Sequence, residues 1–134
     1  MAEVPASIRD LLRDRIETYE SLELVLMLRK NGGAWSSETS LANALGIPTS
    51  AVREELMMLC ERELVEPREG GAHEVRYAPR TPALDDDVRT LAALYDEDRL
   101  AIVQIMNENA IRRVRTFAAR TFADAFLIRK KKNG

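Results

Sequence analysis

The residues Gly46-Ile47-Pro48 separate two short stretches whose apolar side chains recur at helical spacing. Glycine is favoured just past the end of one helix, and proline is tolerated at the start of the next, where the amide groups lack partners. The pattern predicts one helix over 38–45, capped by Ser37, and another over about 49–62. The inner face of the second helix is expected to hold Val52, Leu56, Leu59 and Cys60. So tight a turn between two helices leaves few arrangements open to the chain.

Two further helices are predicted before this pair. Residues 5–16 place apolar side chains at helical spacing, and Thr18 is suited to cap the apolar stretch that follows it. Asn31-Gly32-Gly33 ends that second helix. A short extended piece is expected at residues 34–35.

The segment behind the pair has the composition of a β-hairpin. Residues 64–66 and 73–77 are predicted strands, and the glycine-rich residues 69–72 form the turn between them. The order of elements is therefore helix, helix, turn, helix and β-hairpin. Pro79 and Pro82 then mark a boundary near residue 80.

The boundary divides the chain into three expected parts. They are an N-terminal helix over 1–17, a domain over 18–80, and a helical extension over 81–134 that ends in a basic tail. Within the extension, the spacing predicts a long helix over 83–106 and a break at Asn107-Glu108-Asn109.

Apolar residues of the long helix keep 4-3 spacing, interrupted by Asp98. They are Leu84, Val88, Leu91, Tyr95, Ile102 and Ile105. So narrow a stripe suits a partner helix. Because the residues before 80 hold enough apolar side chains for a core of their own, we expect the stripe to join two chains as a homodimer.

A last predicted helix, over 111–128, offers the stripe a competing partner. Its apolar residues group together on a helical projection: Ile111, Val114, Ala118, Phe122, Ala125 and Phe126. Most of its arginines fall elsewhere, although Arg115 lies inside the apolar arc. Such a helix could fold back over the stripe, pair with a second chain, or lie on an anionic membrane surface.

Charge is distributed unevenly along the chain. The net charge is −2, residues 18–80 carry seven basic and ten acidic side chains, and residues 111–134 carry eight basic and one acidic. Because phosphate contacts come chiefly from lysine and arginine, Lys130, Lys131 and Lys132 are candidate phosphate-binding residues. The alternative is that this basic end is solvated charge with no partner.

The segment over 37–65 resembles the winged helix-turn-helix superfamily. The shared pattern is Leu-Ala-x-x-Leu-Gly-Ile over 41–47, Val-x-x-x-Leu-x-x-Leu over 52–59 and a closing Leu64-Val65. The chain also resembles a group of bacterial winged-helix transcriptional regulators in Tyr19-Glu-x-Leu-Glu-x-Val-Leu-x-Leu-Arg29, Trp35 and Phe122-Ala-Asp-Ala-Phe-x-x-Arg-Lys130. The resemblance implies a mainly α fold with a small β-hairpin wing and long C-terminal helices.

In that superfamily, the helix after the turn enters the DNA major groove and the wing touches the DNA backbone. The resemblance implies that five residues approach double-stranded DNA: Thr49, Ser50, Arg53, Arg68 and Arg76. The expected function is that of a DNA-binding transcriptional regulator acting as a homodimer. Because Glu54 and Glu55 adjoin Arg53, a winged-helix module that binds another protein instead of specific DNA remains the alternative. A third hypothesis is a membrane-surface adaptor that uses the tail.

Neither catalysis nor a cofactor is expected. The chain has one cysteine, Cys60, and one histidine, His73, so it lacks the ligand clusters of metal sites. No base adjoins a nucleophile, and no glycine-rich phosphate loop is present. Trp35 is expected to pack where the chain enters the wing. Without a long apolar run or a signal-peptide pattern, the expected location is the cytoplasm.

Overall fold

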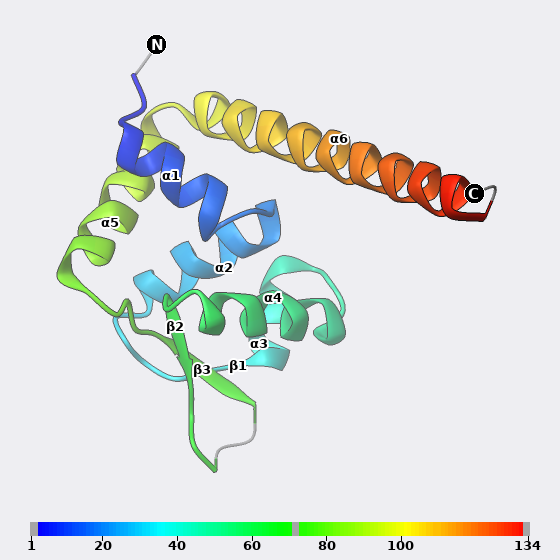
Figure 1. Cartoon of the computed structure of the whole chain (residues 1–134). Helices are drawn as coiled ribbons and strands as arrows, with labels where there is room; N and C mark the ends of the chain where they lie inside the picture. The colour runs from blue at the N-terminus through cyan, green and yellow to red at the C-terminus, as the bar shows by residue number, and fades with distance from the viewer. Residues whose placement is uncertain (1–2, 71–72, 133–134) are drawn as a thin grey trace.

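The computed structural model describes residues 3–70 and 73–132, and side chains as far as residue 127. Figure 1 shows a group of short helices with a small sheet at one end. One long helix projects from the other end of this group. The helices are α1 (Ala6–Asp14), α2 (Tyr19–Lys30), α3 (Glu38–Leu45), α4 (Thr49–Glu61), α5 (Pro82–Glu97) and α6 (Arg99–Lys132). The strands are β1 (Ser36–Ser37), β2 (Val65–Pro67) and β3 (Glu74–Tyr77).

The turn between α3 and α4 forms as its sequence predicts. Ser37 caps α3 by accepting a hydrogen bond of 3.1 Å from the Ser40 amide. Gly46 ends the helix in the left-handed region, at φ 69°, where a side chain would be strained. Pro48 then precedes the first residue of α4. These local features position α4 against α3 through the buried residues Leu41 and Val52.

The three strands form one antiparallel sheet in the order β1-β3-β2. Ser36 lies opposite Val75, and Glu66 lies opposite Arg76. The predicted hairpin is confirmed by the pairing of β2 with β3, although residues 71 and 72 of its predicted turn lie outside the described residues. The extended piece falls at 36–37, not at 34–35. The order of α2, β1, α3, α4, β2 and β3 is that of a winged helix-turn-helix domain, so the predicted fold class is confirmed.

A single apolar core runs through the whole body of the molecule. The most enclosed helix is α2, which is capped by Thr18 and buries Leu22, Leu24, Val25 and Leu28. The same cluster of buried residues extends from Val4 to Met106, so the residues before 80 do not close a separate core. Helix α1 completes it by packing against both α5 and α6.

The prediction of one continuous helix over 83–106 is wrong, because the helix is interrupted at Asp98. This residue leaves the helical region, with φ −145° and ψ 74°, and separates α5 from α6. Its Oδ1 accepts a hydrogen bond of 3.3 Å from the Ala101 amide, as a residue that caps a helix does. The break predicted at 107–109 is also wrong, since α6 runs through it and buries Asn109. Tertiary packing there outweighs the weak helix propensity of asparagine.

The apolar stripe predicted as a dimer interface lies inside the folded chain. All six of its residues are buried: Leu84, Val88, Leu91, Tyr95, Ile102 and Ile105. Helix α1 packs against both α5 and α6 and buries Ile8, Leu11 and Leu12, while the hydroxyl of Tyr95 is bonded to Tyr19 and Glu23 of α2. The folded chain therefore lacks the exposed seam that the predicted interface required. The competing account, in which the last helix folds back over the stripe, is also wrong, because that helix projects from the body (Figure 1).

Candidate nucleic-acid interface

The first turns of α4 form an open, polar surface. Ser50 and Arg53 are exposed on this surface, and Thr49 is half-buried at the start of the helix. The opposite face of α4 is buried, as its apolar spacing predicts: Val52, Leu56 and Leu59. Met57, one turn beyond Arg53, is 61% exposed, so the outer face combines an arginine with a large apolar side chain.

Arg53 is held by a carboxylate from the neighbouring helix. Its Nε lies 3.1 Å from Oε1 and 3.1 Å from Oε2 of Glu38, the first residue of α3. Glu38 is buried, and its amide donates a hydrogen bond of 3.0 Å to the carbonyl oxygen of His73 in the wing. Nδ1 of His73 lies 3.5 Å from Oε1 of the same carboxylate. Glu38 therefore connects the helix-turn-helix to the wing.

The two wing arginines are stacked on Trp35. The guanidinium carbon of Arg76 lies 4.6 Å from the centre of the indole, and that of Arg68 lies 5.6 Å from it. Arg68 Nη1 pairs with Glu74 Oε1 at 3.1 Å, and Arg76 pairs with Glu66 across the strands. The expectation that Trp35 packs at the wing is confirmed. The wing cations are ordered, but each has an acidic partner that offsets its charge.

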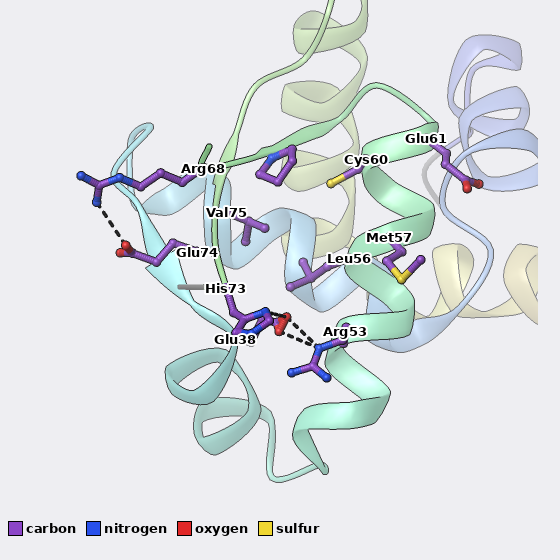
Figure 2. Close-up of a pocket in the computed structure, with 11 residues that line it drawn as sticks. Glu38, Arg53, Leu56, Met57, Cys60, Glu61, Arg68, His73, Glu74 and Val75 are labelled. Atoms are coloured by element: carbon purple, nitrogen blue, oxygen red, sulfur yellow. Dashed lines mark hydrogen bonds and ion pairs between the residues drawn. The ribbon is translucent and has the colours of Figure 1, made fainter. Parts of the chain in front are cut away.

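A groove of about 380 Å³ separates α4 from the wing. Figure 2 shows Val75 on the wing side of the groove, Leu56, Met57 and Cys60 along α4, and the ion pair of Glu38 with Arg53 near the start of α4. The apolar lining consists of Leu56, Met57, Cys60, Pro67 and Val75. Burial, followed by the charge of Glu61, raises the pKa of the Cys60 thiol. The groove thus adds a hollow to the same surface, with an apolar lining and charged side chains beside it.

Glu38 is the residue of this surface that sequence reasoning missed. It follows the capping residue Ser37, where an acidic side chain is expected simply to favour the start of a helix. Its pairing with Arg53 depends on how α3 and α4 cross. The one sequence feature that could have suggested this pairing is that Glu38 and Arg53 lie on either side of the turn at 46–48.

The projecting part of α6 contains the other predicted site residues. Lys130, Lys131 and Lys132 lie within this helix, but their side chains fall outside the described portion of the chain. Arg113 Nη2 donates a hydrogen bond of 3.3 Å to the carbonyl oxygen of Glu17. From residue 114 to residue 127, every side chain is exposed, large apolar ones included: Val114, Phe117, Phe122, Phe126 and Leu127.

The strand order, the turn between α3 and α4, and the outer face of α4 define the class: a winged helix-turn-helix protein with a long C-terminal helix. No protein-family model and no curated protein matches the chain. A solved structure of a mutant of Lactococcus lactis ZitR is similar to it at 15% identity and a TM-score of 0.48. The similarity covers 94% of this chain and 80% of that one. The class therefore rests on the chain's own topology.

The described part of the chain offers neither a metal-binding cluster nor a membrane span. Within residues 3–70 and 73–132, no group of three or more His, Cys, Asp and Glu side chains is placed to hold a metal ion. None of the helices described there has both the length and the apolar composition of a membrane span.

Proposed function

We propose that this chain is a transcriptional regulator that binds double-stranded DNA through α4 and the wing. The observation that supports this most directly is the outer face of α4, which directs Ser50 and Arg53 away from the core at the position where such helices contact bases. Arg68 and Arg76, stacked on Trp35, would approach the phosphates beside it.

The basic tail would supply the positive charge that the surface of α4 and the wing lacks. Because Arg53, Arg68 and Arg76 each pair with a glutamate, the α4 and wing surface carries little net positive charge. Sequence-independent affinity for DNA depends on the release of counterions by unpaired cations. We propose that Lys130, Lys131 and Lys132 provide that affinity. Deleting residues 129–134 should then weaken binding equally for all sequences and flatten its dependence on salt.

We propose that the chain also forms a homodimer, and that its interface is the exposed part of α6 instead of the buried stripe. Exposed phenylalanines on the projecting part of α6, where every side chain from residue 114 to residue 127 is exposed, mark a surface that a partner could cover. Most of the stability of a helix in a protein comes from packing of its apolar face, which the projecting part of α6 does not have within the chain. Pairing of two α6 helices would join two winged domains, which matches the two half-sites that dimeric regulators bind.

A titration on genomic DNA fragments at two salt concentrations tests DNA binding. We expect fragment-specific binding that weakens as salt increases, and a loss of about 1–3 kcal/mol for Arg53→Ala on the preferred fragment. Lys30→Ala, on the last residue of α2, serves as a control for the loss of one positive charge. Equal affinity for all fragments, or none at low salt, would contradict the proposal.

The groove beside α4 favours a second candidate, a module that binds another protein. Its lining is largely apolar, and the arginines at its ends are already neutralised by glutamates. Apolar hollows of this kind accept anchor side chains of a protein partner. Absence of DNA binding at low salt, together with a partner whose binding is abolished by Met57→Glu, would support this candidate over the first.

A further inference from the structure

We propose that Glu38 is a positioning residue that turns Arg53 into a reader of guanine. The inference rests on the proposed DNA binding and names the base that α4 selects. Its basis is the contact between the Glu38 carboxylate, which is 8% exposed, and Nε of Arg53, which is 3.1 Å from both carboxylate oxygens.

The contact leaves the end of the arginine available. Only Nε takes part in the hydrogen bonds and the ion pair described for Arg53, and Figure 2 shows Nη1 and Nη2 directed away from Glu38. These two nitrogens carry parallel N–H donors. Guanine presents two acceptors, O6 and N7, at matching spacing in the major groove, whereas adenine presents one acceptor and one donor. The free end of Arg53 therefore matches the edge of guanine.

Glu38 itself is fixed from two sides. Its amide is bonded to the carbonyl oxygen of His73, and its carboxylate lies 3.5 Å from His73 Nδ1. Because the carboxylate is anchored between α3 and the wing, it limits the rotation of the arginine side chain. An arginine ordered before binding loses less conformational entropy when it meets the base.

The same contact disfavours phosphate as the partner of Arg53. The pair with Glu38 has no net charge, so it adds little to counterion release. A phosphate at Nη1 or Nη2 would also lie near the carboxylate and be repelled by it. Directional hydrogen bonds to a neutral base edge do not meet this repulsion. The pair therefore contributes sequence discrimination more than affinity.

The test is selection of bound duplexes from a randomised library by the full chain, its Glu38→Gln variant and its Arg53→Lys variant. The wild type should enrich a motif with one guanine whose replacement by adenine or 7-deazaguanine weakens binding about 5- to 150-fold. Arg53→Lys should lose that preference while keeping the salt dependence. Glu38→Gln should reduce the ratio of affinities for guanine and adenine. It should also steepen the logarithmic salt slope by about 0.9, because removal of the carboxylate leaves the charge of Arg53 uncompensated.

Matched controls are Glu63→Gln and Arg80→Lys. They alter a more exposed ion pair, with 2.8 Å between its atoms, just beyond the C-terminal end of α4. If Glu38→Gln does not unfold cooperatively, Glu38→Asp, which keeps the charge but moves the carboxylate away from Arg53, takes its place and should show the same loss of discrimination. A Glu38→Gln variant that keeps the wild-type motif and discrimination overturns the role of Glu38. So does an Arg53→Lys variant that weakens all sequences equally. If the wild type enriches no motif, the proposed function is overturned together with the role of Glu38. If the wild type does enrich a motif, the variants test the role of Glu38 alone.

Discussion

The hydroxyl of Tyr77, the last residue of β3, donates a hydrogen bond of 2.7 Å to Oδ1 of Asp85 in α5. This bond joins the wing sheet to the first turns of the C-terminal helices. Arg89 lies 3.5 Å from the other oxygen of the same carboxylate. The orientation of the wing is thus coupled to the part of the chain that leads into α6.

Removing this hydroxyl should destabilise the fold. We expect Tyr77→Phe to lower the free energy of unfolding by about 1–3 kcal/mol, because a half-buried hydrogen bond to a charged acceptor is lost. Urea denaturation followed by circular dichroism measures the change. Thr90→Val, which removes an exposed hydroxyl from the same helix, should have a smaller effect. Equal stability of Tyr77→Phe and the wild type would show that the bond contributes nothing.

Stability should decline at alkaline pH through two tyrosines. Burial, and then the hydrogen bond to Asp85, raise the pKa of Tyr77 above its ordinary value of about 10. Burial and the contacts with Tyr19 and Glu23 do the same for the pKa of Tyr95. Because the folded state favours the neutral phenols, their contribution is complete below about pH 10 and is lost as the pH rises further.

The measurement is the free energy of unfolding between pH 8 and 11. We expect a steeper fall above pH 10 in the wild type than in the Tyr77→Phe, Tyr95→Phe double variant. Parallel curves for the two proteins would contradict the direction of both pKa shifts.

Leu91 should behave as a core residue and not as an interface residue. It is fully buried on the inner face of α5. We expect Leu91→Ala to lower the free energy of unfolding by about 2–5 kcal/mol, as large-to-small changes in a packed core do. Sedimentation at a temperature where the variant is folded should show the wild-type oligomeric state. A variant of unchanged stability but altered association would restore the stripe as an interface.

The exposed face of α6 should control self-association. Val114 and Phe122 lie on its apolar arc and are 68% and 75% exposed. We expect the wild type to sediment as a dimer at micromolar concentration, and the Val114→Ser, Phe122→Ser double variant as a monomer. Arg120→Ser, on the opposite face, should remain dimeric. A monomeric wild type would remove self-association from the proposed function.

Cys60 should react slowly with thiol reagents. Its pKa is raised by burial and by the charge of Glu61, so little thiolate forms at pH 7. We expect Ellman's reagent to modify the folded chain much more slowly than the same chain unfolded in urea. Equal rates would show that the groove beside α4 leaves the thiol fully accessible.

The helix-turn-helix was predictable because its signals are local. Ser37 caps α3 through an amide three residues away, and Gly46 adopts a backbone conformation that few other residues tolerate. The inward position of Val52 follows from helical spacing alone. Sequence therefore determined the class of the domain and the outward face of α4, where Arg53 lies.

Tertiary structure decided which surfaces of the chain pack against one another. Apolar spacing shows that a face will be buried, but it does not identify what covers it. The face of α5 that holds Leu91 is buried within the same chain, where α5 packs against α1 and α6. Whether Asp98 interrupts a seam or caps a helix depends on the direction in which α6 leaves the core. Glu38 reaches Arg53 only because α3 and α4 cross, since residues 15 positions apart come together through packing and not through helical periodicity.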